Sequence, residues 1–456
     1  MTDTITAVAT GAALSAIGII RISGGEAIAV ADKIFRPVCG IRLCDAENRR
    51  MYYGELTGAD GGLIDICLCT ISRGPDSYTG ENTAEFHCHG SPVVLSEVLR
   101  ALFSHGVRQA LAGEFTKRAF LNGRMDLTQA EAVIDLIESE TAYAAQNAAG
   151  QLRGVVTDKL APVYSSLLDV IAHFHVVIDY PDEDVDEFEM QSHLSALIGA
   201  EEELRRLLST HERGMVLRDG IPTAIIGRPN TGKSSLLNAL LGYDRAIVTH
   251  LPGTTRDTVE EKALIGGVTL RLIDTAGLRK AGDVVESLGI ERTRAAIRGA
   301  GLVILVLDGS EVLCDEDFDA LRSIPPGLPC IAAVNKYDLP PVQSEDELSN
   351  LGLEYCRVSA LTGEGLDNLD AMIRKMFPES GTPPTGELIT NARQAEAISR
   401  AADSVGYAIA AIGASVTPDA ILTDIESALT AIGELTGKTM REDVVTRIFE
   451  RFCVGK

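Results

Sequence analysis

The sequence is short of basic residues. It has 41 Lys and Arg against 65 Asp and Glu, which gives a formal net charge of −24 at pH 7. A negative field of this size favours solubility and opposes non-specific contact with nucleic acid or an anionic membrane. We therefore expect any nucleic-acid partner to meet a local basic patch or to arrive on another protein.

Long hydrophobic runs and cysteines are also scarce. The longest uncharged stretches, 4–20 and 405–418, fall short of the ~20 mostly apolar residues of a membrane-spanning helix. The first is not preceded by the basic segment of a signal peptide, so we expect no membrane association. Nine cysteines in 456 residues are too few for a disulfide scaffold and favour a reducing, cytoplasmic compartment.

The residue pattern changes three times along the chain. An α/β segment is followed by a helical segment, a second α/β segment and a final helical segment. Helical sequence on both sides of an α/β unit indicates one helical domain interrupted by an insertion, since the termini of a domain often lie close together. Two separate helical domains are the alternative. The predicted boundaries are 1–118, 119–216, 217–378 and 379–456.

Periodicity gives the elements within these segments. The first contains strand-like runs at 17–22 and 64–71, and the helical segment is broken into two arms by the acidic stretch 181–189. Apolar strands alternate with helices in the third, which predicts a doubly wound, mostly parallel sheet with helices on both faces. Its predicted strands are 223–227, 270–274, 302–308, 330–335 and 355–359. The fold class is thus multidomain α/β plus α.

The third segment begins with a phosphate-binding pattern. Gly227-Arg-Pro-Asn-Thr-Gly-Lys-Ser234 fits G-x-x-x-x-G-K-[ST] between a predicted strand and a predicted helix. Glycines let backbone N–H groups face phosphate oxygens, and the helix N-terminus favours their negative charge. We expect Lys233 to reach the outer phosphates and the Ser234 hydroxyl to bind Mg²⁺.

Further motifs follow the later strands. Asp274-Thr-Ala-Gly277 can hold the Mg²⁺ shell and sense the γ-phosphate, and Thr255 is expected to give Mg²⁺ a second hydroxyl. Asn335-Lys-Tyr-Asp338 selects GTP over ATP, because its last carboxylate can accept the N1–H and 2-amino hydrogens of guanine. Ser359-Ala360 is placed to support the base. The ordered set predicts a GTPase.

One expected catalytic residue is missing. Many GTPases have Gln after the D-x-x-G motif to orient the attacking water, but this chain has Leu278, which cannot do so. The Asn230 amide oxygen could instead help hold a monovalent cation against the phosphates, with backbone carbonyls of 246–255 around it. Local hydrogen bonding of Asn230 within the loop is the alternative.

The N-terminal segment carries a polar cluster in Gly18–Ser23, Pro75–Gly90 and Gly113–Gly123. Within it, His87, Cys88 and His89 have the side chains of metal ligands. In a strand, however, the two histidines share one face and the cysteine lies on the other. No second ligand pair of matching spacing follows, so we favour a polar organic ligand over zinc.

Taken together, these residues resemble the MnmE/TrmE family of tRNA modification GTPases. The resemblance runs from end to end and includes the terminal Phe452-Cys-Val-Gly-Lys456, which other GTPases lack. The remaining matching motifs are G-R-P-N-x-G-K-S, T-T-R-D, D-T-A-G-L-R, Y-T-G-E…E-F-H-C-H-G and G-E-F-T-K-R-A-F-L-N-G.

The family resemblance implies a homodimer that joins a flavin-dependent partner, MnmG, in a heterotetramer. Together they add a carboxymethylaminomethyl-type or aminomethyl-type group at carbon 5 of the wobble uridine of certain tRNAs. The one-carbon unit comes from 5-formyl-tetrahydrofolate or a related tetrahydrofolate, and K⁺-stimulated hydrolysis of GTP drives domain closure. A ribosome-assembly GTPase, and a folate-dependent aminomethyl transferase with a regulatory GTPase unit, are the alternatives.

The resemblance also assigns residues. The folate positions are Arg21, Glu85, Arg124 and Lys456, the K⁺ positions are Asn230, Thr249, Leu251 and Thr254, and the Mg²⁺ positions are Ser234 and Thr255. The predicted catalytic residues are Asn230, Lys233, Glu286, which falls on a carboxylate that orients water, and Cys453. The predicted GTP contacts are Asn230, Thr231, Gly232, Lys233, Ser234, Ser235, Thr249, His250, Leu251, Pro252, Gly253, Thr254, Thr255, Asp274, Thr275, Ala276, Gly277, Asn335, Lys336, Asp338, Ser359 and Ala360.

Each transferred role has a simpler alternative. Arg21 could form an ordinary surface ion pair, Glu286 could be a solvated acid on a helix, and Cys453 could be an inert buried thiol. Chain ends usually fray unless they are tied down. We therefore expect the tail 452–456 to dock against the folate pocket of the N-terminal domain, with Cys453 facing the one-carbon unit.

Overall fold

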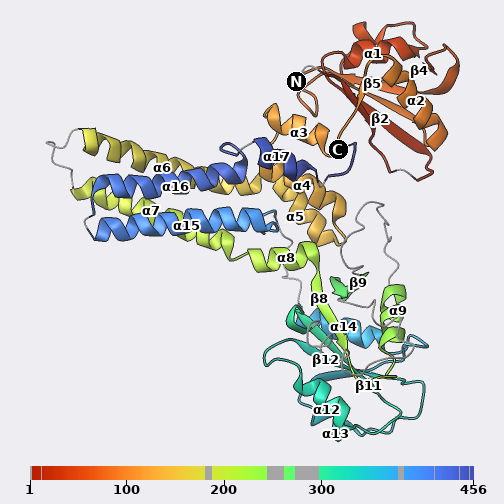
Figure 1. Cartoon of the computed structure of the whole chain (residues 1–456), viewed down its shortest axis with the longest axis vertical. Coiled ribbons are helices and arrows are strands. Elements are labelled where there is room, and N and C mark those ends of the chain that lie inside the picture. Colours follow the sequence, from red (N-terminus) through yellow and green to blue (C-terminus); the bar gives the residue numbers. More distant parts are fainter. Residues whose placement is uncertain are drawn as a thin grey trace. The chain divides into compact units, whose positions relative to one another are not determined.

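The computed structural model describes residues 3–11, 13–179, 187–243, 261–272, 297–377, 385–414, 416–440, 442–450 and 452–455 (Figure 1). It divides into two compact units. Unit 1 contains Met1–Ile134, Gln151–Arg205 and Glu396–Lys456, and unit 2 contains Asp135–Gly150 and Arg206–Ala395. Among the described helices, none combines the length and the apolar character that a membrane span requires.

Unit 1 begins with a seven-stranded sheet in the order β3-β4-β5-β6-β2-β1-β7, antiparallel except between β1 and β7. The strands are β1 Ile5–Val8, β2 Ile17–Ser23, β3 Phe35–Pro37, β4 Met51–Thr57, β5 Leu63–Ser72, β6 Thr83–His89 and β7 Arg108–Gln109. The accompanying helices are α1 Ala27–Ile34, the 3₁₀ turn η1 Leu43–Asp45, α2 Pro92–Ser104 and α3 Glu114–Leu121. The two predicted strands of this region are confirmed as β2 and β5.

Helices α1 and α2 cover one face of this sheet. Alternate residues of β2 and β6, such as Ile20, Ile22 and Phe86, are fully buried in a core with residues of α1 and α2. The intervening residues, Arg21 and Glu85 among them, lie on the opposite face, because side chains alternate along a strand. That second face carries the Arg21–Glu85 ion pair.

Two groups of helices flank the second α/β segment in the sequence. They are α4 Leu127–Glu138, α5 Ala142–Leu152, α6 Val155–Asp179, α7 Glu187–Leu208 and α8 His211–Asp219 before it, and α15 Ala392–Gly413, α16 Pro418–Thr436 and α17 Glu442–Phe449 after it. Within unit 1, α16 packs along α6 (Figure 1). Leu127 and Ala130 of α4 share a hydrophobic core with Val445 and Phe449 of α17 and with Phe452. Segments far apart in the sequence thus form one helical core, which supports an insertion.

The predicted break between the two helical arms is too long. Residues 181–186 lie outside the described residues, but α7 already begins at Glu187, so 187–189 are helical. Acidic residues are compatible with the first turn of a helix, because the helix dipole favours negative charge there. The acidic run therefore marks a helix start as well as a break.

Most of the predicted linker 381–385 lies outside the described residues.

Unit 2 contains a six-stranded sheet in the order β13-β12-β11-β8-β10-β9, parallel except between β9 and β10. The strands are β8 Ile221–Ile226, β9 Glu261–Ile265, β10 Val268–Leu272, β11 Leu302–Asp308, β12 Cys330–Asn335 and β13 Glu354–Arg357. The helices are α9 Lys233–Tyr243, α12 Asp315–Arg322, α13 Glu345–Ser349 and α14 Leu366–Met376.

This sheet is buried on both faces. Leu302, Ile304 and Val306 of β11 enter one hydrophobic core, and Val303 and Leu305 of the same strand enter another. A strand buried on both sides reads as a continuous apolar run. The predicted doubly wound, mostly parallel sheet is therefore confirmed.

Candidate functional site

The predicted phosphate-binding loop connects β8 to α9. Gly227 follows the last residue of β8 and α9 begins at Lys233, which is the strand–loop–helix context that the motif requires. A Cβ on Gly227 would lie 2.3 Å from the Val306 carbonyl oxygen, and one on Gly232 would lie 2.1 Å from Asn335 Nδ2. Both glycines also have positive φ. No larger residue fits either position.

Asn335 joins this loop to the predicted base-binding loop. Its Nδ2 donates to the Thr231 carbonyl at 2.8 Å, and its Oδ1 accepts from the Ala360 backbone N–H at 2.9 Å. The residue is only 3% exposed. Asn335 therefore positions the two loops relative to each other. Ser235, the last predicted contact of the first loop, is exposed on α9.

The amine of Lys233 lies inside the loop. Its Nζ donates to the carbonyl oxygens of Gly227 at 2.8 Å and Arg228 at 2.6 Å. Burial lowers the pKa of this amine. Ser234 follows on the first turn of α9 and is half-buried. The two residues thus stand where the motif places a phosphate-binding cation and a Mg²⁺ hydroxyl.

Asn230 is exposed and adopts a left-handed backbone conformation, with φ of 65°. Its side chain makes no hydrogen bond to another described residue. The described residues therefore do not support the alternative role of Asn230, local hydrogen bonding within the loop. Residues 249–255, Asp274–Gly277 and Glu286 lie outside the described residues. The predicted K⁺ cage, the Thr255 ligand and the water-orienting acid therefore remain predictions.

The predicted base-reading motif is held by its neighbours. Asp338 is exposed, and its Oδ1 accepts a hydrogen bond from Ser359 Oγ at 2.6 Å. Lys336, with φ of 67°, pairs with Asp308 at the end of β11. Burial would raise the pKa of Asp308, but hydrogen bonds from Lys336 and Ser310 outweigh it and lower the pKa. Sequence reasoning had no signal for Asp308, because it ends an apolar strand and belongs to no motif.

The N-terminal cluster centres on a cross-strand ion pair. Arg21 of β2 lies directly opposite Glu85 of β6, and its Nε donates to Glu85 Oε1 at 2.7 Å. The guanidinium also lies over two rings, 5.2 Å from the Tyr78 centroid and 5.6 Å from the Phe115 centroid. The Arg21 side chain is thus held by more contacts than it would have in an ordinary surface ion pair.

Arg124 reaches the same region through a loop. Its Nη1 lies 3.8 Å from Asp76 Oδ1, and its Cγ lies beside Gly80. Tyr78, whose ring stacks on Arg21, belongs to this 76–80 loop. The loop therefore links two of the predicted folate residues, while the last one, Lys456, lies outside the described residues.

A buried arginine that sequence reasoning missed supports this loop. Arg118 of α3 is 1% exposed and pairs with Glu81, Glu114 and Asp3. Burial would raise the pKa of Glu114, but hydrogen bonds from Arg108, the Leu111 amide and Arg118 lower it overall. The G-E-F-T-K-R motif was the available signal, since its acid and base are four residues apart and meet on a helix.

The C-terminal tail docks on the N-terminal segment, whereas its predicted place at a folate pocket stays a prediction. Val454 forms an antiparallel bridge with Ala112, and the Gly113 N–H donates to the Cys453 carbonyl at 3.2 Å. Gly455 approaches the Val8 backbone so closely that a Cβ would lie 2.2 Å from its carbonyl oxygen. Cys453 itself is exposed, so the buried-thiol alternative is wrong.

Comparison with known families covers almost the whole chain. A family model described as "MnmE helical domain" matches residues 127–453, and one described as "GTP-binding protein TrmE N-terminus" matches residues 4–124. The tRNA modification GTPase MnmE of Clostridioides difficile (strain 630) is 39% identical over 461 residues, covering 100% of this chain and 99% of the relative. The protein of the same name from Roseiflexus sp. (strain RS-1) is 41% identical over 464 residues, with the same coverage of both chains.

Proposed function

This chain belongs to the tRNA modification GTPase MnmE family, and from that membership we propose the specific reaction that it serves. It hydrolyses GTP in tRNA modification. We propose that, with a flavin-dependent MnmG partner, it adds a carboxymethylaminomethyl-type or aminomethyl-type group to carbon 5 of the wobble uridine. The one-carbon unit would come from 5-formyl-tetrahydrofolate or a related tetrahydrofolate.

The arrangement around Asn335 is the observation that carries the nucleotide part of the proposal. One buried amide holds the phosphate-binding loop and the Ser359–Ala360 loop at a fixed spacing. Ser359 orients Asp338, whose carboxylate would read guanine. The Ser234 hydroxyl suits Mg²⁺, and the exposed Asn230 amide suits K⁺ as part of a cage with Thr249, Leu251 and Thr254.

The N-terminal cluster supports a folate site. Arg21 and Glu85 offer a cation and an anion side by side, with the Tyr78 ring next to them. A tetrahydrofolate has carboxylates, amide-like edges and a flat ring, and these groups match that set. We assign Arg124 and Lys456 to the same ligand, with Cys453 on the docked tail near the one-carbon unit.

An exposed apolar surface supports the homodimer. Tyr53 of β4 and Leu68 of β5 are cross-strand neighbours, and they are 57% and 39% exposed. Leu68 in turn lies opposite His87, so these residues share the sheet face that carries Arg21 and Glu85. Large apolar residues gathered on one exposed face mark an interaction site. We propose that a second copy of the chain covers it.

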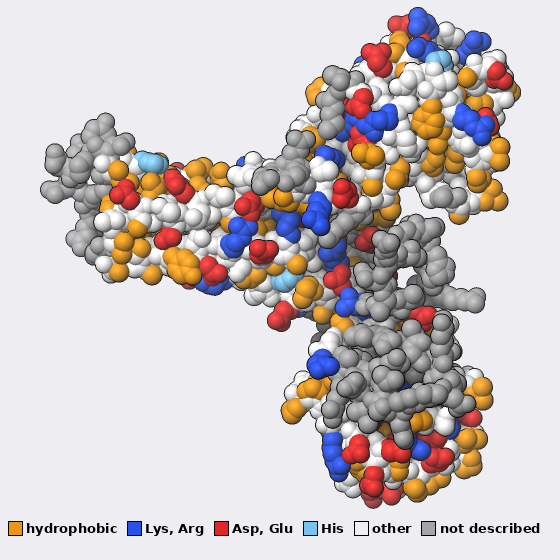
Figure 2. Space-filling model, in the orientation of Figure 1, with side chains coloured by type: hydrophobic (Ala, Val, Ile, Leu, Met, Phe, Trp, Pro, Cys, Tyr) orange, Lys and Arg blue, Asp and Glu red, His pale blue; other side chains and the backbone are white. Residues whose placement is uncertain are grey.

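Charge favours delivery of the tRNA by the partner. The chain has a formal net charge of −24, and Figure 2 shows Lys and Arg interspersed with Asp and Glu over the described part of the face in view. Such a surface does not attract RNA strongly. We propose a heterotetramer in which MnmG provides most of the RNA contact, in a reducing cytoplasm where none of the nine cysteines forms a disulfide.

The domain limits form part of the proposal. We propose an N-terminal folate-binding and dimerisation domain at 1–118, a helical domain formed by 119–216 and 379–456, and a GTPase domain at 217–378. The shared core of α4 and α17 supports the two-part helical domain. GTP-driven motion of the inserted domain would then reach the folate chemistry through the helices.

Nucleoside analysis tests the proposed function. Mass spectrometry of tRNA from a strain lacking this chain should show loss of the C5-modified wobble uridine. The wild-type chain should restore it, whereas Lys233→Ala, which lacks the loop amine, should not. A normal nucleoside profile together with immature ribosomal particles would instead favour the ribosome-assembly alternative.

A further inference from the structure

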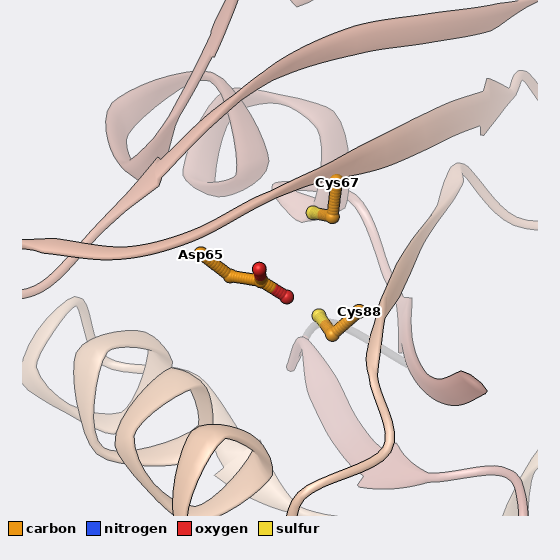
Figure 3. Close-up of side chains that lie close together, drawn as sticks. All are labelled: Asp65, Cys67 and Cys88. Carbon is orange, nitrogen blue, oxygen red and sulfur yellow. The ribbon is translucent and has the colours of Figure 1, made fainter. Parts of the chain in front are cut away.

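Three metal-ligating side chains converge in the N-terminal sheet. They are Asp65 and Cys67 of β5 and Cys88 of β6, and Figure 3 shows their ligand atoms pointing toward one another. One carboxylate oxygen and the two Sγ atoms all lie within 4.8 Å of one another. Cys67 is 5% exposed, Cys88 is 1% exposed, and the Asp65 side chain is 9% exposed.

Strand register produces this cluster. The β5–β6 ladder pairs Leu68 with His87, so the next antiparallel step sets Cys67 opposite Cys88. Asp65 precedes Cys67 by two residues and therefore shares its face. Both thiols belong to the core between the sheet and helices α1 and α2. A carboxylate at the edge of an apolar core is costly unless it has polar or cationic partners.

A neighbouring histidine fixes the carboxylate. Asp65 Oδ2 accepts from the His89 backbone N–H at 2.9 Å, and Oδ1 lies 2.8 Å from His89 Nδ1. Metal-ligating carboxylates are commonly oriented by such outer hydrogen bonds. Each carboxylate oxygen has more than one lone pair, so Asp65 can bind an ion while it keeps His89.

We propose that Asp65, Cys67 and Cys88 bind a thiophilic divalent cation of the zinc type, which clamps β5 to β6. Tetrahedral zinc takes sulfur at ~2.3 Å and carboxylate oxygen at ~2.0–2.2 Å, so its ligand atoms lie roughly 3.5–3.8 Å apart. Small side-chain rotations bring the three groups from their present separation to that distance. His89 orients Asp65 from outside, and water takes the fourth position.

The proposed site is not the His87, Cys88 and His89 set, which has metal-ligand side chains but which the alternation of a strand disfavours as a zinc site. His87 and His89 lie on the other face of β6 from Cys88, as the strand alternation predicted. The additional ligands come from the adjacent strand β5, about twenty residues earlier. A search for a matching pair after the H-C-H segment could not find them.

Cobalt titration tests the proposal on the full chain. The protein is reduced, stripped with a chelator and titrated with Co²⁺ in excess Mg²⁺ without nucleotide, so that hard-cation sites are occupied. One equivalent should give a thiolate-to-cobalt charge-transfer band that Zn²⁺ abolishes. Cys67→Ala and Cys88→Ala should each lose the band, and Asp65→Asn should weaken Co²⁺ binding by roughly tenfold or more.

Cys69→Ala is the matched control. Cys69 is fully buried on the same face of β5, but its thiol is not part of the cluster. This variant makes a similar core cavity and should keep the band. A second measurement needs no variant: Zn²⁺ should protect Cys67 and Cys88 of the wild-type chain from alkylation, as mapped by peptide mass spectrometry.

Four results would overturn the assignment, three of them from the measurements above. These are a missing charge-transfer band, an unchanged band in both cluster-cysteine variants, and equal alkylation of Cys67 and Cys88 with and without Zn²⁺. A Cys67–Cys88 disulfide in protein purified without reductant would do so too, because it would make the pair a redox element.

Discussion

At the scale of single residues, the nucleotide site depends on contacts that its sequence motif does not reveal. The motif presents Asn335, Lys336 and Asp338 as one group, but the structure gives them separate tasks. Asn335 spaces two loops, Lys336 pairs with Asp308, and Asp338 is the exposed carboxylate that Ser359 orients. Of the three, Asp338 has the exposed carboxylate, which suits it to read the base.

We therefore expect Asp338→Asn to change base preference. The amide can no longer accept two hydrogens from guanine, but it can donate to the 2-oxo group of xanthine. Two charge-assisted hydrogen bonds are involved, so kcat/KM for GTP should fall by roughly 100-fold or more while xanthosine triphosphate becomes the better substrate. Steady-state hydrolysis of both nucleotides measures this. Asp346→Asn, an exposed acid on α13, should change neither, and retained GTP preference would remove Asp338 from base reading.

Asn230 gives a second prediction at the scale of single residues, the K⁺ dependence of GTP hydrolysis. Leu278 cannot orient water, and the exposed Asn230 amide is a suitable ligand for a large monovalent cation. GTPase kcat should be roughly 10–100-fold higher in K⁺ than in Na⁺ at equal ionic strength, because Na⁺ is too small for the same cage. Asn230→Ala should abolish the difference. Asn238→Ala, an exposed amide on α9, should preserve it. Equal rates of the wild-type chain in both salts would contradict the proposal.

At the scale of elements, α3 is fixed by a charge network. Arg118 is almost fully buried, yet it bonds to acids just before β1, directly after the 76–80 loop and on its own helix. Glu114 adds Arg108 to this network. A buried charge is tolerated only when it is paired. The network therefore holds the loop that carries Tyr78 against the sheet that carries Arg21.

This network predicts an acid-sensitive stability. The folded-state pKa of Glu114 lies below its ordinary value of 4.5. Its stabilisation is therefore present above about pH 4.5 and is lost as the pH falls through the lowered value. Glu114→Gln should cost about 1–3 kcal/mol of unfolding free energy near pH 7, and the difference from wild type should shrink below about pH 4.5. Urea titrations measure both. Glu97→Gln, from an exposed pair on α2, should show little effect, and a constant penalty at all pH values would be the contrary result.

Sequence reasoning succeeded where burial was uniform. Strands β11 and β12 have their predicted bounds because every residue in them is buried, so the apolar run and the strand coincide. In contrast, β4 alternates between buried and exposed residues and contains Gly54, so no apolar run marked it. Edge strands β3 and β7 have three and two residues, too few for a periodic signal.

Register was the main information that the sequence could not supply. The candidate folate residues were found by family resemblance, but their pairing was not. Arg21 and Glu85 are 64 residues apart, and only the β2–β6 register makes them neighbours. The Asp65, Cys67 and Cys88 cluster arises in the same way from β5 and β6. Long-range register depends on the packing of a whole sheet, which local periodicity does not encode.

At the scale of the whole molecule, the two predicted chemistries occupy different units. The phosphate-binding loop and Asn335 lie in unit 2, whereas Arg21, Glu85 and the docked tail lie in unit 1. Phe452 is buried in the helical core, while the next residues pair with Ala112 and Gly113 of the N-terminal segment. The tail thus joins the helices to the N-terminal segment within one unit.

This separation yields a prediction for the exposed thiol at the end of the tail. Cys453 presents its backbone carbonyl to Gly113 and its side chain to solvent, so serine should preserve the docking. Cys453→Ser should leave GTPase kcat within about twofold of wild type, because the nucleotide site is in the other unit, a change of at most ~0.4 kcal/mol in the barrier. The same variant should impair wobble-uridine modification in cells, measured by tRNA nucleoside analysis, if the thiol takes part in the one-carbon step.

The control is Cys39→Ser, which replaces an exposed thiol elsewhere in the N-terminal segment and should leave tRNA modification normal. Full modification by Cys453→Ser would leave the tail a purely structural clamp, and a parallel failure of GTP hydrolysis would show that the variant disturbs more than the folate site.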